Sequence, residues 1–313
     1  MLKIGIVGVG HFGKYHLNCL KTSENFKLMG FYDIDTDVCE QVKEEYGVPY
    51  FRSFEEMIRN IDVLDVVTPA STHFDYAQQA VSQNKHVFIE KPLAKSYTEA
   101  KQLFDMLDEH KVKIQVGHIE RFNPAYTAAM PYLDSPVRVE VERNGTYNLR
   151  NKDVSVIEDL MIHDIDILIQ TVKSPIKKIT AEGSTVKSSS FDIVDVVFEF
   201  ENGALAHLKA NRVAETPYRA ATFYHSGNYV SVDYMNKKTE VHKLNGHAVN
   251  GNGVHKMNGN GVLKPEIREI NAIKEELDSF YNSIVNDIVP PVTIYDSMSV
   301  MKICEDIKKK ISA

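Results

Sequence analysis

The order of apolar and amphipathic segments in the first 120 residues is the feature that most constrains the fold. Apolar runs of strand length alternate there with segments that carry the apolar spacing of helices. The expected strands are 2–8, 26–32, 62–67, 85–89 and 113–117. The expected helices are 12–22, 36–46, 54–59, 73–84 and 97–110, and two of them open with the capping boxes Ser53-x-x-Glu56 and Ser96-x-x-Glu99. Because fully apolar strands alternate with helices, residues 1–120 are predicted to form a doubly wound α/β domain with a parallel sheet.

Residues 121–313 follow a different pattern. Val137, Val139 and Val141 alternate with charged side chains, which is the period of a strand with one buried face. Further strands are expected at 176–183, 191–200, 204–213, 219–225 and 229–235. The dipeptide Asn202-Gly203 predicts a tight hairpin between two of them. This part of the chain is therefore predicted to be an α+β domain on a largely antiparallel open sheet.

Helices and loops complete the expected second domain. A helix at 155–171 should cover one face of the sheet, and the other face is then available to a second subunit. Two more helices are expected at 266–286 and 297–311. The Gly/Asn-rich segment 245–262 predicts a mobile hairpin tip.

Composition and cysteine usage narrow the class of protein. With 36 basic and 43 acidic side chains the net charge is −7, which does not favour a nucleic-acid partner. Three widely spaced cysteines without a CxxC pair indicate a reducing compartment rather than a disulfide framework. The apolar N-terminal run is interrupted by glycine and lacks a cleavage site, and no run approaches 18 apolar residues. We expect a soluble, cytoplasmic protein.

A glycine motif, Gly8-x-Gly10-x-x-Gly13, stands between the first expected strand and the first expected helix. In that context Gly8 permits a tight turn, Gly10 lets the backbone approach a diphosphate, and Gly13 lets the helix pack closely on the strand. The N–H groups at the start of the first expected helix would then face the diphosphate, and His11 and Phe12 at that start are candidate cofactor-binding residues. The motif predicts a dinucleotide-binding site.

Asp33 ends the second expected strand, 20 residues after Gly13. A carboxylate there accepts hydrogen bonds from a ribose 2′-hydroxyl and repels a 2′-phosphate, so NAD is expected over NADP. Ligands of parallel sheets bind outside the carboxyl ends of the strands. The residues that follow those ends are Gly8–Gly13, Asp33, Thr68, Pro69, His73, Glu90, Lys91 and Pro92. We expect all of these residues to meet at one cofactor crevice.

Four segments of the chain resemble the glucose–fructose oxidoreductase / inositol dehydrogenase / rhizopine catabolism (Gfo/Idh/MocA) family. They are "GIVGVGHFGKYH", "VVTPASTHFDYAQQAVSQNKHVFIEKPLAKS", "VGHIERFNPA" and "DLMIHDID". The resemblance implies hydride transfer between nicotinamide and a secondary alcohol or ketone of a cyclic polyol, sugar or nucleotide sugar. It assigns proton transfer to Lys91 of the Glu-Lys-Pro triplet, places Glu90 at the nicotinamide ribose, and implies that the bond before Pro92 is often cis.

The family's second signature, D-x-G-x-H-x-x-D, reads DLMIHDID in this chain, with Met161 at the usual glycine position. Asp159, His163 and Asp166 are spaced to share one face of a helix. A carboxylate and an imidazole one turn apart can orient a sugar hydroxyl and share its proton. The alternative is a buried histidine satisfied by a neighbouring carboxylate. No metal site is expected, because no second His or Cys cluster accompanies this segment.

The segment VGHIERFNPA resembles family members that act on UDP-N-acetylhexosamines and oxidise the sugar 3-hydroxyl. Arg121 and Asn123 in it are candidate substrate-binding residues, although Arg121 could equally serve a structural salt bridge. Either Lys91 or His163 could be the direct acid/base, with Asp159 binding or orienting the substrate. Two alternative functions remain: an NADPH-dependent reductase of another carbonyl compound, and a non-catalytic NAD-binding sensor. The family also implies a homodimer or homotetramer.

Overall fold

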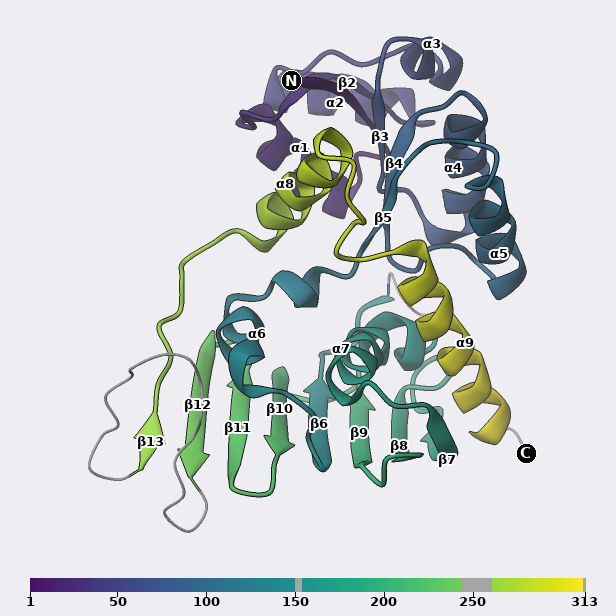
Figure 1. Cartoon of the computed structure of the whole chain (residues 1–313). Helices are drawn as coiled ribbons and strands as arrows, with labels where there is room; N and C mark the ends of the chain where they lie inside the picture. The colour runs from purple at the N-terminus through teal and green to yellow at the C-terminus, as the bar shows by residue number, and fades with distance from the viewer. Residues whose placement is uncertain (150–153, 244–260, 312–313) are drawn as a thin grey trace. The chain divides into compact units, whose positions relative to one another are not determined.

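The computed structural model describes residues 1–149, 154–243 and 261–311. It divides the chain into two compact units, and Figure 1 shows their elements. The first unit comprises Met1–Ile119 and Asn271–Met301, and the second comprises Glu120–Ile270 and Lys302–Ala313.

This division differs from the expected domains in the last part of the chain. Residues 271–301 belong to the first unit, although the sequence places everything after residue 120 in the second domain. The reason is the packing of helix α8 (Ala272–Val285), which buries Leu277 and Phe280 in the hydrophobic core around the first sheet. Helix α9 (Ile294–Ile311) contributes residues to both units.

The first unit contains the predicted parallel sheet, in the strand order β2-β1-β3-β4-β5 (Figure 1). Its strands are β1 (Leu2–Val7), β2 (Phe26–Tyr32), β3 (Val63–Val66), β4 (His86–Glu90) and β5 (Ile114–Gly117). Its other helices are α1 (His11–Lys21), α2 (Thr36–Tyr46), α3 (Phe54–Arg59), α4 (His73–Ser82) and α5 (Tyr97–Met106). Because β1 lies between β2 and β3, the chain crosses over in opposite directions from β1, and this switch point is where such sheets bind ligands.

Both predicted capping boxes are present at helix starts in this unit. The hydroxyl oxygen of Ser53 accepts the N–H of Glu56 at 3.1 Å, and that of Ser96 accepts the N–H of Glu99 at 3.2 Å. The two glutamates reach back to the N–H group one residue before the serine, at Arg52 and Lys95. These bonds satisfy N–H groups that lack an intrahelical partner and so fix where α3 and α5 begin.

The second unit contains an eight-stranded sheet in the order β13-β12-β11-β10-β6-β9-β8-β7. Its strands are β6 (Arg138–Asn144), β7 (Ile176–Ser184), β8 (Ile193–Phe200), β9 (Leu205–Asn211), β10 (Tyr218–Tyr224), β11 (Asn228–Asp233), β12 (Lys238–Lys243) and β13 (Val262–Leu263). The pair β6–β9 is parallel and the other pairs are antiparallel, which confirms the predicted largely antiparallel sheet. Strands β8 and β9 meet at the predicted Asn202-Gly203 hairpin, where Gly203 has a φ of +87°.

Helices α6 (Pro124–Ala129) and α7 (Ile162–Val172) lie over one face of this sheet (Figure 1). Val139 and Val141 of β6 meet Ile167 and Leu168 of α7 on that face. The alternate residues of β6, such as Glu140, point to the opposite face. The period-two pattern thus places apolar residues under the helices and charged residues on the open side.

Some predicted elements differ from the observed ones. Strands β12 and β13 are additional to the prediction, and the segment predicted as a mobile hairpin tip lies almost entirely outside the described residues. Helix α8 begins later and α9 earlier than expected. No helix in the described part of the chain is long and apolar enough to cross a membrane.

Candidate active site

The glycine-rich turn after β1 leaves no room for a side chain at two positions. Gly8 has a φ of +88°, and a Cβ there would lie 2.8 Å from the carbonyl oxygen of Val67. A Cβ on Gly13 would lie 2.1 Å from the carbonyl oxygen of Gly8, so α1 packs on the turn only with glycine there. At Gly10 no described heavy atom comes within 4 Å of the Cβ position. That open space lets a ligand approach the backbone closely.

The first turn of α1 fits an anion. Among the described residues no side chain caps the helix at Gly10, and its first turn contains no acidic residue. The N–H groups at the start of a helix lack intrahelical partners and favour negative charge. His11 and Phe12 are exposed in this turn, and the ring of Tyr15 contacts His11 with centroids 5.2 Å apart. The backbone here suits the diphosphate of a dinucleotide.

Asp33 follows β2 and faces the same turn. Its Oδ2 accepts the N–H of Val9 at 2.9 Å, and its Oδ1 accepts the N–H of Asp35 at 3.1 Å. The side chain is half-buried, and an ionised carboxylate keeps further lone pairs for ribose hydroxyls. The negative charge held at this point opposes the 2′-phosphate of NADP, so the geometry supports the expected preference for NAD.

The loops after β3 and β4 are tied together by His73. Its Nδ1 lies 2.8 Å from the carbonyl oxygen of Pro92, and its Nε2 lies 2.7 Å from that of Thr68. The hydroxyl of Thr68 in turn accepts a hydrogen bond from Thr72 at 2.8 Å. Both ring nitrogens of the buried His73 thus face backbone carbonyl oxygens; burial lowers the pKa of His73, and the neutral ring donates to one of the two. We therefore assign His73 to holding these loops, with Thr68 and Pro69 at their surface.

Glu90 ends β4, and Lys91 follows it at the carboxyl edge of the sheet. The Oε2 of Glu90 accepts the backbone N–H of Lys91 at 3.1 Å, and its Oε1 lies 3.2 Å from Nε2 of His16. A Cβ on Gly117 would lie 2.8 Å from Oε1, so the glycine that ends β5 makes room for the carboxylate. The Lys91–Pro92 peptide bond is cis, as the resemblance implies. The Glu90 carboxylate is fixed by α1, by β5 and by the backbone of Lys91.

Two buried residues outside the sequence motifs support Glu90: His16 of α1 and Asp65 of β3. The Nδ1 of His16 lies 3.0 Å from Oδ2 of Asp65, and both side chains are fully buried. Because each ring nitrogen faces a carboxyl oxygen, both contacts are hydrogen bonds to ionised carboxylates when the ring carries two protons. Burial by itself lowers the pKa of His16, but the charges and hydrogen bonds of Asp65 and Glu90 outweigh burial and raise the pKa well above its ordinary value.

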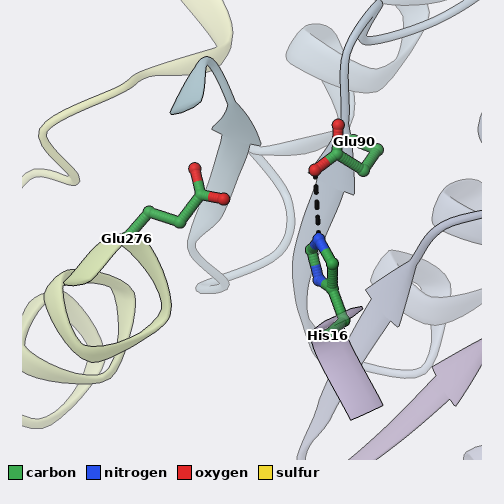
Figure 2. Close-up of side chains that lie close together, drawn as sticks. All are labelled: His16, Glu90 and Glu276. Carbon is green, nitrogen blue, oxygen red and sulfur yellow. Dashed lines mark hydrogen bonds and ion pairs between the residues drawn. The ribbon is translucent and has the colours of Figure 1, made fainter. Parts of the chain in front are cut away.

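Glu276 of α8 brings a third carboxyl group toward this cluster (Figure 2). It is fully buried, and no described residue donates a hydrogen bond to either of its carboxyl oxygens. Ligand-type atoms of His16, Glu90 and Glu276 lie within 4.8 Å of one another. At that separation two ionised carboxylates repel by at least about 3 kcal/mol in a medium of effective dielectric constant near 20. Burial and the charge of Glu90 raise the pKa of Glu276 well above its ordinary value.

The same three residues are the one group among the described residues with the spacing of a metal site. A metal ion would have to take Nε2 of His16, which faces Glu90 in a hydrogen bond. We therefore interpret the group as a hydrogen-bonded cluster, and the absence of a metal site stays a prediction. Sequence signals for it existed: a histidine on the buried stripe of α1, and an aspartate inside the apolar strand β3.

The second signature begins with a π-helical turn, Ile157–Met161, which continues into α7. A π turn winds more residues per turn, so Asp159 and His163 depart from the regular α-helical stripe that the sequence predicts; such turns recur at functional sites. Asp159 is half-buried and His163 is 9% exposed. Met161 is fully buried, so the side chain at the family's glycine position is accommodated in the core.

Arg121 and Asn123 are engaged with the protein itself. Arg121 donates to both oxygens of Asp166, from Nε at 2.7 Å and from Nη2 at 2.5 Å. Asn123 caps α6 with its side-chain oxygen, and its amide donates to Glu120 at 2.9 Å and to the carbonyl of Tyr234 at 3.2 Å. The geometry favours the structural salt bridge for Arg121 and a capping role for Asn123. Asp166 is the partner in that salt bridge, so it does not act together with Asp159 and His163 as the helical spacing predicts.

A second buried ion network, not predicted from the sequence, lies next to these residues. Arg143 of β6 is 1% exposed and donates to Asp164 of α7 through Nε and Nη2, the shortest bond being 2.7 Å. Its Nη1 donates to Glu120 at 2.9 Å. Burial by itself lowers the pKa of Arg143, but these two carboxylates outweigh burial and raise it. The network joins α7 to the sheet and to the segment that carries Arg121.

Comparison with known proteins agrees with this geometry. Residues 2–118 match the oxidoreductase family with an NAD-binding Rossmann fold, and residues 117–248 match the GFO/IDH/MocA C-terminal domain. The UDP-N-acetylglucosamine 3-dehydrogenase of Acidithiobacillus ferrooxidans is 30% identical over 90% of this chain and 88% of its own. The scyllo-inositol 2-dehydrogenase (NAD(+)) of Bacillus subtilis is 29% identical over 69% of this chain and 68% of its own.

Solved structures extend the likeness to nearly the whole chain. The UDP-N-acetylglucosamine 3-dehydrogenase GnnA from Acidithiobacillus ferrooxidans superposes with a TM-score of 0.89 at 25% identity, covering 99% of this chain and 97% of its own. A levoglucosan dehydrogenase in complex with NADH and L-sorbose shares the fold, with a TM-score of 0.85 at 18% identity over 99% of this chain and 96% of its own. The chain belongs to the GFO/IDH/MocA family of oxidoreductases with an NAD-binding Rossmann fold.

Proposed function

We propose that this oxidoreductase uses NAD to oxidise a UDP-N-acetylhexosamine at the sugar 3-hydroxyl. The observation that carries the proposal is the likeness to the UDP-N-acetylglucosamine 3-dehydrogenase of Acidithiobacillus ferrooxidans over 90% of the chain. The substrate is transferred from that relative, whereas the oxidoreductase class rests on the family itself.

The nucleotide-binding edge of the first unit supports the cofactor assignment. The backbone around Gly10 and the first turn of α1 would hold the diphosphate, and Asp33 would hold the adenosine ribose. Glu90, at the end of β4, is the residue that the resemblance places at the nicotinamide ribose. NAD, when bound, supplies the acceptor for a hydride from the carbinol carbon.

The protein's own part in the reaction is to bind the sugar and remove the hydroxyl proton. Lys91 is our first candidate for the base, because its backbone is held by the Glu90 carboxylate at the cofactor edge. His163 is the second candidate, and Asp159 one turn earlier would orient the hydroxyl. An efficient base titrates near the working pH and comes within hydrogen-bond reach of the proton it takes.

The test is reduction of NAD, followed by nicotinamide absorbance, with a panel of UDP-sugars, free sugars and inositols. Wild type is compared with Lys91→Met, and with Lys95→Met as a control at a neighbouring lysine. Turnover of UDP-N-acetylglucosamine by wild type and Lys95→Met, lost in Lys91→Met, supports the proposal. Turnover of another sugar only would refute the substrate. Reduction of a carbonyl compound with NADPH, or NAD binding with no turnover, would favour the reductase or sensor alternatives.

We also propose a cytoplasmic homodimer or homotetramer that pairs through the open face of the eight-stranded sheet. That face carries exposed Val197 beside charged residues, and a hollow of about 270 Å³ is lined by residues including Glu140, Lys209 and Thr222. The proposal rests on the family resemblance, which implies such an oligomer; charged groups like these suit the polar rim of an interface. Light scattering coupled to gel filtration measures the mass, and a monomer at micromolar concentration would contradict the proposal.

A further inference from the structure

The position of Glu90 depends on side chains that do not reach the edge of the sheet. Its Oε1 faces His16, which in turn faces Asp65, and the two supporting residues are fully buried. Its Oε2 accepts the backbone N–H of Lys91. A continuous line of hydrogen bonds therefore runs from the interior of the first unit to the backbone of Lys91.

We propose that His16, Asp65 and Glu276 form a buried network of protonated and ionised groups that keeps Glu90 ionised and fixed beside Lys91. In this network His16 carries two ring protons, Asp65 is ionised, and Glu276 is a neutral carboxylic acid. His16 is then a positioning residue for the oxidoreductase reaction, because it acts through Glu90. The inference rests on the assignment of Lys91 to the reaction but not on the identity of the sugar.

The charge balance of the cluster supports this proton assignment. With His16 doubly protonated, its positive charge lies between the negative charges of Asp65 and Glu90 and stabilises both. An ionised Glu276 would add a further buried negative charge near Glu90, to which no described residue donates a hydrogen bond. A neutral acid at Glu276 avoids that additional charge.

The placement of Glu276 is itself fixed by the sheet. The side-chain amide of Gln115, in β5, donates to the backbone carbonyl of Glu276 at 2.7 Å and to the hydroxyl of Ser279 at 3.2 Å. This contact anchors α8 to the strand next to β4. The carboxyl group of Glu276 is thereby held near Glu90 and His16 rather than in solvent (Figure 2).

The groups that act electrostatically on Glu90 come from every neighbouring element. They are His16 of α1, Asp65 of β3, Glu276 of α8, His73 of α4, and Lys91 itself. Burial by itself raises the pKa of Glu90, but the hydrogen bond and charge of His16, together with Lys91, outweigh it and lower the pKa. Removing His16 should therefore let Glu90 take up a proton at a higher pH.

The first measurement follows the ring nitrogens of His16 by NMR in the full-length protein with NAD bound, assigned with a His16→Asn variant. We expect His16 to keep both ring protons well above the ordinary histidine range near pH 6.5. In Asp65→Asn, which keeps the size and removes the charge, the second proton should be lost at a lower pH. Loss of the second proton near pH 6.5 in wild type overturns the proposal.

The second measurement is the pH dependence of NADH binding and of NAD reduction with UDP-N-acetylglucosamine. In His16→Asn the acid limb of both profiles should move up by about one to two pH units. His86→Asn is the matched control, because His86 begins β4 at the end opposite Glu90, and its profiles should follow wild type. If wild type fails to oxidise this sugar, only the substrate proposal fails. The pH dependence of NADH binding then tests the network without a substrate. Identical acid limbs for His16→Asn and His86→Asn contradict the network.

Discussion

Replacing Glu276 by glutamine is a direct thermodynamic test of a neutral, buried carboxylic acid. Glutamine has nearly the shape of the protonated side chain and cannot ionise. In wild type, burial and the charge of Glu90 raise the pKa of Glu276 above its value of 4.5 in the unfolded chain. Between these two pKa values the folded state holds a proton that the unfolded state has released.

The sign and size of the effect follow from proton linkage. Where the folded state binds more protons than the unfolded state, the free energy of unfolding falls as the pH rises. The limiting slope for one group is about 1.4 kcal/mol per pH unit. It begins at the unfolded pKa, near pH 4.5, and ends when the pH passes the raised folded pKa. The stability of wild type relative to Glu276→Gln should therefore decline steadily above pH 4.5.

The assay is urea-induced unfolding of both proteins at several values between about pH 5 and pH 8. Over two pH units the difference between the two unfolding free energies should change by up to about 2.7 kcal/mol in favour of Glu276→Gln. The matched control is Glu275→Gln, which changes an exposed carboxyl group one residue earlier on α8. Its unfolding free energy should run parallel to wild type. Parallel curves for wild type and Glu276→Gln would refute the reasoning.

Three further substitutions test other parts of the account. Gly13→Ala places a methyl group 2.1 Å from the carbonyl oxygen of Gly8; we expect a loss of about 3 kcal/mol in unfolding free energy and weaker NADH binding by fluorescence titration. Asp33→Asn should improve NADP affinity relative to NAD by roughly tenfold or more in the same titration, because a like-charge contact is relieved. Arg143→Met leaves the Asp164 carboxylate buried without its partner and should lower the unfolding free energy by about 3–5 kcal/mol.

Local patterns in the sequence are sufficient to predict most of the strands and the nucleotide-binding turn. The strands of the first unit are short apolar runs between helical segments, and those of the second show an alternation that marks one buried face. Strand β12 is missed because Lys238–Lys243 contains a single aliphatic residue, Val241, among polar ones. Its buried positions become apparent only when it pairs with β11.

Long-range partnerships are what the sequence does not reveal. Arg121 has the chemistry of a substrate-binding residue, but its guanidinium forms a salt bridge with Asp166, 45 residues away in the sequence. Glu276 joins His16 because α8 packs against the first sheet, and no local pattern indicates which sheet a late helix will cover. Charged residues at buried positions of a helix or strand are the sequence signal for such networks, and their partners are defined only by the fold.

The most direct test of the central claim is transfer of deuterium from carbon 3 of the sugar to the cofactor. The protein would be mixed with NAD and UDP-N-acetylglucosamine that carries deuterium at that carbon, and the nicotinamide product would be examined by mass spectrometry. The account predicts one deuterium in the reduced nicotinamide with wild type and none above background with Lys91→Met. Reduced nicotinamide without deuterium from wild type would contradict the proposed oxidation at the 3-position.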